Sequence, residues 1–167
     1  TLTIDNVVPS AAIAGPVSGV RGQPRKFTLS ASDVSAMDQA AGFTFAIDWN
    51  GDGIVDQTLS GASGMEVEHV FPSVGNYEIR VTATDKDGGV SALTTSAITS
   101  SAWAYETDAE QPSLTNLVWG GTEGIDSFGF VPGLVLTQLV DGQFFPVPIL
   151  TFVEFNGRII VYGQGSN

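Results

Sequence analysis

The densest group of oxygen-bearing side chains in the sequence lies between residues 48 and 56. It places Asp48, Asn50, Asp52 and Asp56 at alternate or near-alternate positions around two glycines. Carboxylate and amide oxygens at this spacing can surround a hard cation, and Ca²⁺ in proteins takes about six to eight oxygen ligands. The same residue types also cap turns by hydrogen-bonding the backbone of their own loop. The spacing leaves two interpretations open, a calcium site and a self-capped hairpin loop.

A helix-loop-helix calcium site does not fit this run. Such a loop needs a bidentate glutamate at its twelfth position, and the sequence has Leu59 there. No helical pattern flanks the loop on either side. If calcium binds here, it binds in a loop between strands.

The composition excludes several other chemistries. The chain of 167 residues contains no cysteine and one histidine. It therefore has no disulfide, no thiol nucleophile and no multi-histidine metal centre, so that oxygen atoms must hold any bound metal.

Catalysis also finds little support in the sequence. The single histidine, His69, alternates with Val67 and Phe71 and therefore reads as a residue at the end of a strand rather than a general base. The chain lacks the G-x-S-x-G motif of serine hydrolases. Glu66 and Glu68 would share the solvated face of one strand, where nothing raises a carboxyl pKa. We predict that the chain is not an enzyme.

Charge excludes two classes of partner. The sequence has 18 acidic and 6 basic side chains, which give a net charge of -12. This charge repels a phosphate backbone and an anionic bilayer alike. No segment approaches the roughly 20 consecutive apolar residues of a membrane span. We predict no nucleic-acid binding and no membrane insertion.

Apolar residues recur at spacing two along most of the chain, which predicts an all-β protein. The runs with this alternation begin at Phe27, Phe43, Val67 and Tyr77. Turn-forming residues separate them, as expected for a sandwich of two antiparallel sheets. One short helical stretch is expected over residues 33–40.

The strand pattern pauses near residue 100, which divides the chain. We expect a β-sandwich over residues 1–100, an acidic linker over 101–116 and a smaller antiparallel β-meander over 117–167. Strands are predicted at residues 117–119, 128–131, 134–140, 144–147, 149–155 and 159–162. The pairs Asp141-Gly142 and Asn156-Gly157 are typical of two-residue hairpin turns.

Residues 6–99 resemble the polycystic kidney disease (PKD) repeat domain, an immunoglobulin-like β-sandwich common in secreted bacterial proteins. The resemblance rests on the runs FTFAIDWNGDG and HVFPSVGNYEIRVTATDKDGG, in that order. The family more often has a second aromatic residue and one residue fewer before the GDG turn. The loop from Asp48 to Asp56 departs from the family in this detail.

The resemblance implies a calcium site near one end of the sandwich. In this family the ion, where bound, is held by an N-terminal Asn, an Asp after the second strand and an Asp of the closing turn. The matching residues here are Asn6, Asp33 and Asp85, and Asp38 and Asp87 are further candidates. Solvated turn carboxylates without a metal are the alternative interpretation.

Residues 121–129 are similar to one RTX, or hemolysin-type, calcium nonapeptide repeat, in which Asp126 would be the ligand. Residues 163–167 resemble the opening of another. Because such repeats share ions between successive turns, one copy does not complete a site. The similarity suggests a meander that leads into calcium-binding repeats.

Together these patterns predict a non-catalytic module of a larger bacterial protein, secreted or on the cell surface. It would act as a spacer, scaffold or adhesion segment, with neighbouring domains, a surface protein or a polysaccharide as partners. The alternative is a carbohydrate-binding accessory domain of a secreted hydrolase, with Trp103, Tyr105 and Trp119 as a stacking platform. The same three rings would otherwise pack the two segments together, which we favour.

Overall fold

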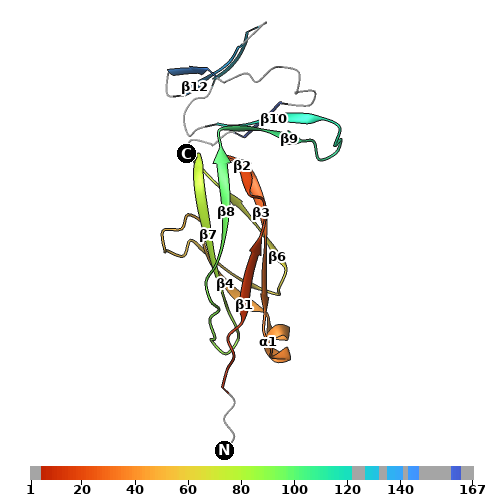
Figure 1. The fold of residues 1–167 in the computed structure, drawn as a ribbon, viewed down its shortest axis with the longest axis vertical. Helices are drawn as coiled ribbons and strands as arrows, with labels where there is room; N and C mark the ends of the chain where they lie inside the picture. The colour runs from red at the N-terminus through yellow and green to blue at the C-terminus, as the bar shows by residue number, and fades with distance from the viewer. Residues whose placement is uncertain (1–4, 122–126, 132–134, 141–142, 147–158, 163–167) are drawn as a thin grey trace, which may run out of the picture. The chain divides into compact units, whose positions relative to one another are not determined.

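The computed structural model of the chain describes residues 5–121, 127–131, 135–140, 143–146 and 159–162 (Figure 1). In this described part, strands predominate and the helix is short. The elements up to Ser101 are β1 (Ser10–Ala14), β2 (Ser18–Val20), β3 (Pro24–Ser32), α1 (Ala36–Ala41), β4 (Phe43–Asp48), β5 (Gln57–Gly61), β6 (Met65–Val70), β7 (Gly75–Thr84) and β8 (Thr94–Ser101). Those that follow are β9 (Trp103–Thr107), β10 (Thr115–Gly120), β11 (Ser127–Val131), β12 (Val135–Val140), β13 (Gln143–Pro146) and β14 (Ile159–Tyr162).

The chain forms two compact units. The first comprises residues 1–18, 25–69 and 76–99, and the second comprises residues 19–24, 70–75 and 100–167. The strands up to β8 form a three-stranded sheet in the order β1-β3-β6 and a five-stranded sheet in the order β2-β8-β7-β4-β5. Strand β3 pairs antiparallel with β1, and β4 pairs antiparallel with both β5 and β7.

In the first unit the two sheets lie face to face and bury one side of each strand. Alternate residues of β3, β4 and β7 are 0–4% exposed, namely Phe27, Leu29, Ala31, Phe43, Phe45, Ile47, Ile79, Val81 and Ala83. The rings of Phe27 on β3 and Trp49 after β4 meet across the core at 5.3 Å. The predicted all-β, immunoglobulin-like sandwich is confirmed, because the period of two places each apolar set on one face.

Helix α1 occupies the stretch where the sequence predicts one. The Ser35 side chain caps its N-terminus by accepting a hydrogen bond from Asp38 N at 3.3 Å. Gly42 ends the helix with a φ of 80°, and a side chain there would come within 2.7 Å of the Gly61 carbonyl oxygen. The capping serine and the terminal glycine hold the helix to less than two turns.

The second unit contains two further three-stranded sheets, in the orders β14-β10-β9 and β11-β12-β13. Strands β11, β12 and β13 pair antiparallel, as predicted for a meander. Strand β14 instead pairs parallel with β10, which the predicted antiparallel arrangement does not include. Parallel neighbours need a long crossover connection, and the segment that holds β11 to β13 provides it.

The prediction that residues 101–116 form a linker is wrong at the level of secondary structure. This stretch contains β9 and the start of β10, which pair antiparallel with Trp103 opposite Trp119. The acidic composition of the stretch does not mean that it is a linker, because Asp108 is only 1% exposed. Asp108 accepts hydrogen bonds from Glu110 N and Gln111 N, both at 2.9 Å, and closes the β9–β10 connection. The proposed domain boundary near residue 100 stays a prediction.

Several predicted features lie outside the described residues. They are the strand at 149–155, the turns Asp141-Gly142 and Asn156-Gly157, the repeat stub at 163–167, and Asp126.

Replacing Phe45 by alanine should test the core of the sandwich. Phe45 is 0% exposed, and the cavity left by its ring should lower the free energy of unfolding by about 3–5 kcal/mol. Urea denaturation measures this change. Val17→Ala, at a position that is 74% exposed, is the control and should cost less than about 0.5 kcal/mol. Equal losses for the two variants would contradict the core assignment.

Candidate functional site

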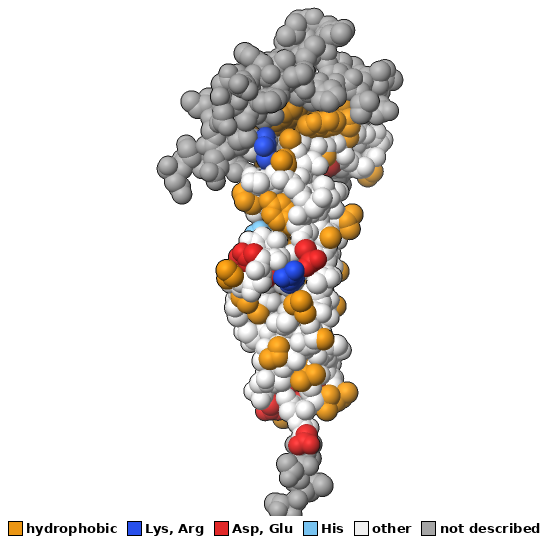
Figure 2. Space-filling model, turned by 60° about the vertical axis from the view of Figure 1, so that its left-hand side comes forward, with side chains coloured by type: hydrophobic (Ala, Val, Ile, Leu, Met, Phe, Trp, Pro, Cys, Tyr) orange, Lys and Arg blue, Asp and Glu red, His pale blue; other side chains and the backbone are white. Residues whose placement is uncertain are grey.

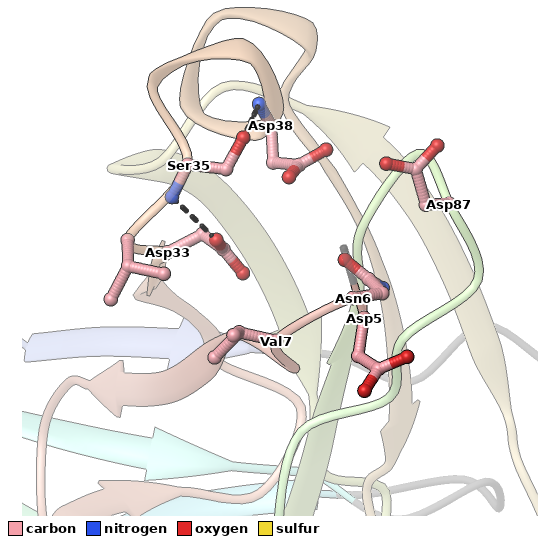
Figure 3. Close-up of a pocket in the computed structure, with 8 residues that line it drawn as sticks. Asp5, Asn6, Val7, Asp33, Ser35, Asp38 and Asp87 are labelled. Carbon is pink, nitrogen blue, oxygen red and sulfur yellow. Dashed lines mark hydrogen bonds between the residues drawn. The ribbon is translucent and has the colours of Figure 1, made fainter. Parts of the chain in front are cut away.

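A cavity of about 490 Å³ lies in the first unit where three distant chain segments meet (Figure 3). These segments are the residues before β1, the connection from β3 into α1, and the turn between β7 and β8. The lining residues are Asp5, Asn6, Val7, Asp33, Val34, Ser35, Asp38 and Asp87. We call this cavity the end pocket. Four of its eight lining residues are aspartates, so that its chemistry suits a cation.

Asp33 presents one oxygen atom that has no donor. Its Oδ1 accepts a hydrogen bond from Ser35 N at 2.8 Å, which shapes the turn before α1. Its Oδ2 is buried and accepts no hydrogen bond in the described part of the chain. In Figure 3 the Asp33 carboxylate points toward the side on which Asn6 lies. A buried carboxylate oxygen without a donor is costly unless something else compensates it.

Asp38 is the most buried carboxylate of the end pocket. Its side chain is 3% exposed, and its Oδ1 lies 3.1 Å from Nζ of Lys86. This contact is an ion pair that is not aligned as a hydrogen bond. Lys86 also contacts the carboxylate of Asp87, whose side chain is 52% exposed. One ammonium group therefore serves two carboxylates of the end pocket.

Asp85 does not line the end pocket. Its Oδ2 accepts a hydrogen bond from the Asn6 side chain at 2.9 Å, and its Oδ1 accepts bonds from Asp87 N at 2.9 Å and Gly89 N at 2.8 Å. Burial raises the pKa of Asp85, but the bonds from Asn6 and from the turn backbone outweigh it and hold the pKa below its ordinary value. Oδ2 of Asp85 thus binds the N-terminal segment, and Oδ1 binds the backbone of the β7–β8 turn.

Close packing around Asp85 also requires a glycine. A Cβ atom at Gly89 would lie 2.4 Å from Asp85 Oδ2 and 2.5 Å from Asn6 Nδ2. No side chain fits in that space, so Gly89 permits the bond between Asn6 and Asp85.

The structure brings together four of the five residues that the family resemblance implies. Asn6, Asp33, Asp38 and Asp87 line the end pocket, whereas Asp85 bonds to Asn6 without lining the pocket. The sequence analysis missed Asp5, whose position next to Asn6 was the available signal.

The loop between β4 and β5 contains the other predicted ligands. Asp48 is 5% exposed and accepts three backbone hydrogen bonds. Gly51 N at 2.6 Å and Asn50 N at 3.2 Å donate to its Oδ1, and Gly53 N at 2.8 Å donates to its Oδ2. Burial raises the pKa of Asp48, but these bonds, with the nearby charge of Arg80, lower it below its ordinary value.

The remaining side chains of this loop also bond to its backbone. Asn50 Oδ1 accepts from Asp52 N at 2.9 Å, and Asp52 Oδ1 accepts from Ile54 N at 2.8 Å. Asp56 Oδ2 accepts from Trp49 N at 2.7 Å. These contacts favour the self-capped loop over the calcium site, which stays a prediction here.

Neither the end pocket nor this loop is a preformed site of several carboxylates. Among the described residues, no group of three or more acidic or imidazole side chains is arranged to hold a metal ion. The end pocket nevertheless fits a hard cation in its donor chemistry, because its donors are oxygens and Asp33 Oδ2 is buried without a hydrogen-bond donor.

His69 stacks on the indole ring of Trp49, with ring centroids 4.3 Å apart and planes 8° apart. Burial lowers the pKa of His69, and the charge of Asp56 opposes this in part. The imidazole is therefore a packing group on Trp49, in agreement with its predicted place at a strand end.

The PKD domain family model matches residues 10–98 of this chain. No curated protein matches it. Among the described residues, no helix is long and apolar enough to cross a membrane.

Three solved structures are similar to this chain. The PKD domain of an M14-like peptidase from Thermoplasmatales archaeon SCGC AB-540-F20 is 23% identical, with 57% of this chain and 98% of that chain covered and a TM-score of 0.48. Fibronectin(III)-like modules of Clostridium thermocellum CbhA are 26% identical over 57% of this chain and 47% of theirs, with a TM-score of 0.44. The CARDB domain of a Pyrococcus furiosus protein, in complex with di-metal ions, is 14% identical over 59% and 97%, with a TM-score of 0.42.

Replacing Asp48 by asparagine should destabilise the first unit, because the loop N–H groups lose a charged acceptor. We expect a loss of about 1–3 kcal/mol in the free energy of unfolding near neutral pH. The folded-state pKa of Asp48 lies below its ordinary value of 3.8. The stabilisation by Asp48 is therefore fully present above about pH 4 and is lost as the pH falls through the folded-state pKa.

Urea unfolding of the wild type and Asp48→Asn across this pH range measures the effect. Asp52→Asn is the matched control, since Asp52 is exposed and caps a single backbone N–H. A difference between wild type and Asp48→Asn that does not shrink in acid would contradict the role assigned to the Asp48 carboxylate.

Proposed function

This chain belongs to the PKD domain family, and from that premise we propose that it is a non-catalytic spacer or scaffold module of a larger secreted or surface protein, stiffened at one end by calcium. PKD domains are generally non-catalytic, occur in extracellular proteins and typically sit beside other domains. The observation that carries the calcium part is the meeting of three distant chain segments at the end pocket.

Rigidity is the property that the first unit supplies. Its two sheets bury their facing sides, and its tight turns are capped by aspartates. On the face drawn in Figure 2, apolar side chains of the sandwich are scattered among polar ones. Scattered apolar residues are ordinary for a protein surface and do not mark a docking face. These features support a spacer or scaffold role.

A catalytic role finds no support in the carboxylates of this unit. A carboxyl group that acts as a general acid near neutral pH needs a raised pKa. The pKa values of Asp48 and Asp85 shift in the opposite direction. Hydrogen bonds outweigh burial in both, from backbone N–H groups to Asp48 and from the Asn6 side chain and backbone N–H groups to Asp85. His69 is held against Trp49. These groups serve structure.

Calcium at the end pocket would stiffen the module by joining chain segments that the sheets do not join there. Asn6, Asp33, Asp38 and Asp87 are the side chains that would hold it, and the ion would add positive charge among their carboxylates. Binding of this kind would fix the residues before β1 to the body of the sandwich. The ion would therefore stiffen the end of the sandwich at which the chain enters β1.

The alternative, a carbohydrate-binding accessory domain, has less support. Trp119 and Trp49 are each 3% exposed and offer no ring face to a sugar. Trp103 and Tyr105 are half-buried, and their rings meet edge to face at 79°, so they do not form one flat platform. Adhesion to a surface protein or polysaccharide is compatible with the module, and a glycan array would test it.

Calcium should raise the melting temperature of the wild type, and EDTA should reverse the rise. Calcium at about 100 times its dissociation constant stabilises by about 2.7 kcal/mol, equivalent to a shift of about 10 °C or more for a domain near 90 residues. Differential scanning calorimetry with and without calcium measures the shift. If neither calcium nor EDTA changes the melting temperature of the wild type, calcium has no part in the proposed function.

Matched variants can show whether calcium binds at the end pocket or in the β4–β5 loop. Asp33→Asn in the end pocket should abolish the calcium-dependent shift, whereas Asp52→Asn in the β4–β5 loop should leave it unchanged. The opposite result would place the ion in the β4–β5 loop instead.

A further inference from the structure

Lys86 contacts two carboxylates of the end pocket. It lies in the β7–β8 turn, and its ammonium contacts both Asp38 and Asp87. Asp38 lies 48 positions earlier in the chain, after the start of α1. The lysine therefore joins two of the three segments that form the end pocket.

The ion pair with Lys86 offsets the cost of burying the Asp38 carboxylate. The Asp38 side chain is 3% exposed, and an ionised carboxylate at such burial is strongly destabilising unless a cation compensates it. Lys86 provides that cation and remains 38% exposed itself. A partly exposed lysine ammonium is charged at neutral pH, because the ordinary pKa of lysine is about 10.4.

We propose that Lys86 is a built-in competitor of divalent cations at the end pocket, and that a calcium ion can reach Asp38 and Asp87 only by displacing its ammonium group. The inference rests on the proposed function, which assigns a cation to this pocket.

Displacement of Lys86 is physically accessible. An ammonium on a flexible stem that is already partly exposed can return to water with little rearrangement. Calcium carries twice the charge and accepts more oxygen ligands than an ammonium can contact. At low calcium concentration Lys86 joins α1 to the β7–β8 turn. At high calcium concentration the ion replaces its ammonium group and joins the same two segments. The lysine thus sets the calcium concentration at which the exchange occurs.

The test compares Lys86→Met with wild type and with Lys26→Met. Lys26 lies 3.7 Å from Glu66 and 4.0 Å from Glu68 in exposed pairs outside the end pocket, so Lys26→Met makes the same change in net charge. Isothermal titration with calcium chloride measures affinity, and melting in EDTA measures stability without metal.

Lys86→Met should bind calcium about fivefold more tightly than wild type, or tighter still, because one positive charge has left the pocket. In EDTA it should melt below wild type, and calcium should close that gap. Lys26→Met should match wild type in affinity. Lys86→Arg, which keeps the charge, should also bind calcium with wild-type affinity.

Each outcome separates this inference from the proposed function. If all variants bind calcium with wild-type affinity, competition by Lys86 is wrong while calcium binding stands. If Lys86→Met binds calcium and wild type does not, competition is supported and the calcium role of the natural chain fails. If neither binds calcium, both ideas are overturned. A rise in affinity for Lys26→Met equal to that for Lys86→Met would show a general charge effect and overturn the inference.

Discussion

Burial of one face of each sheet is the interaction on which the rest of this structure depends. The chain has no cysteine and therefore no disulfide to hold its sheets together. Rows of residues on β3, β4 and β7 with almost no exposed surface meet between the sheets. Their packing fixes where each strand ends, and the turn residues follow from those ends. The acidic turns come together because the core positions the strands that carry them.

Several aspartates among the described residues accept hydrogen bonds from the backbone of their own turns. Asp48, Asp85 and Asp108 are each buried, and each accepts at least two N–H groups of the turn it lies in. A large negative charge is thereby compatible with tight loops, since partial positive charges of the backbone surround these carboxylates. Asp33 and Asp38 differ, because each keeps a buried oxygen without a backbone donor.

Local patterns in the sequence predicted the sandwich well. The alternation from Phe27, Phe43 and Tyr77 identified β3, β4 and β7, since burial on a strand depends on spacing along the chain itself. What the sequence did not predict depends on distant partners. The pairing of β10 with β14 spans a long crossover. The burial of Asp108 was missed for another reason: its partners Glu110 N and Gln111 N lie in the same short turn, and the linker prediction rested on composition alone.

In the candidate site, too, the sequence indicated individual residues but not the contacts between distant segments. The family pattern indicated Asn6, Asp33 and Asp38, but not that Lys86 would meet Asp38. Those residues become neighbours only when α1 and the β7–β8 turn are placed at one end of the sandwich. Spacing along the chain contains no sign of that contact.

The pairing of β1 with β3 has a mechanical consequence. The two strands run antiparallel along a continuous register from Ser10 opposite Ser32 to Ala14 opposite Thr28. Tension drawn along the residues before β1 would load these hydrogen bonds in shear, all at once, rather than peel them one by one. The single amide of Asn6 on Asp85 would carry the first of that load.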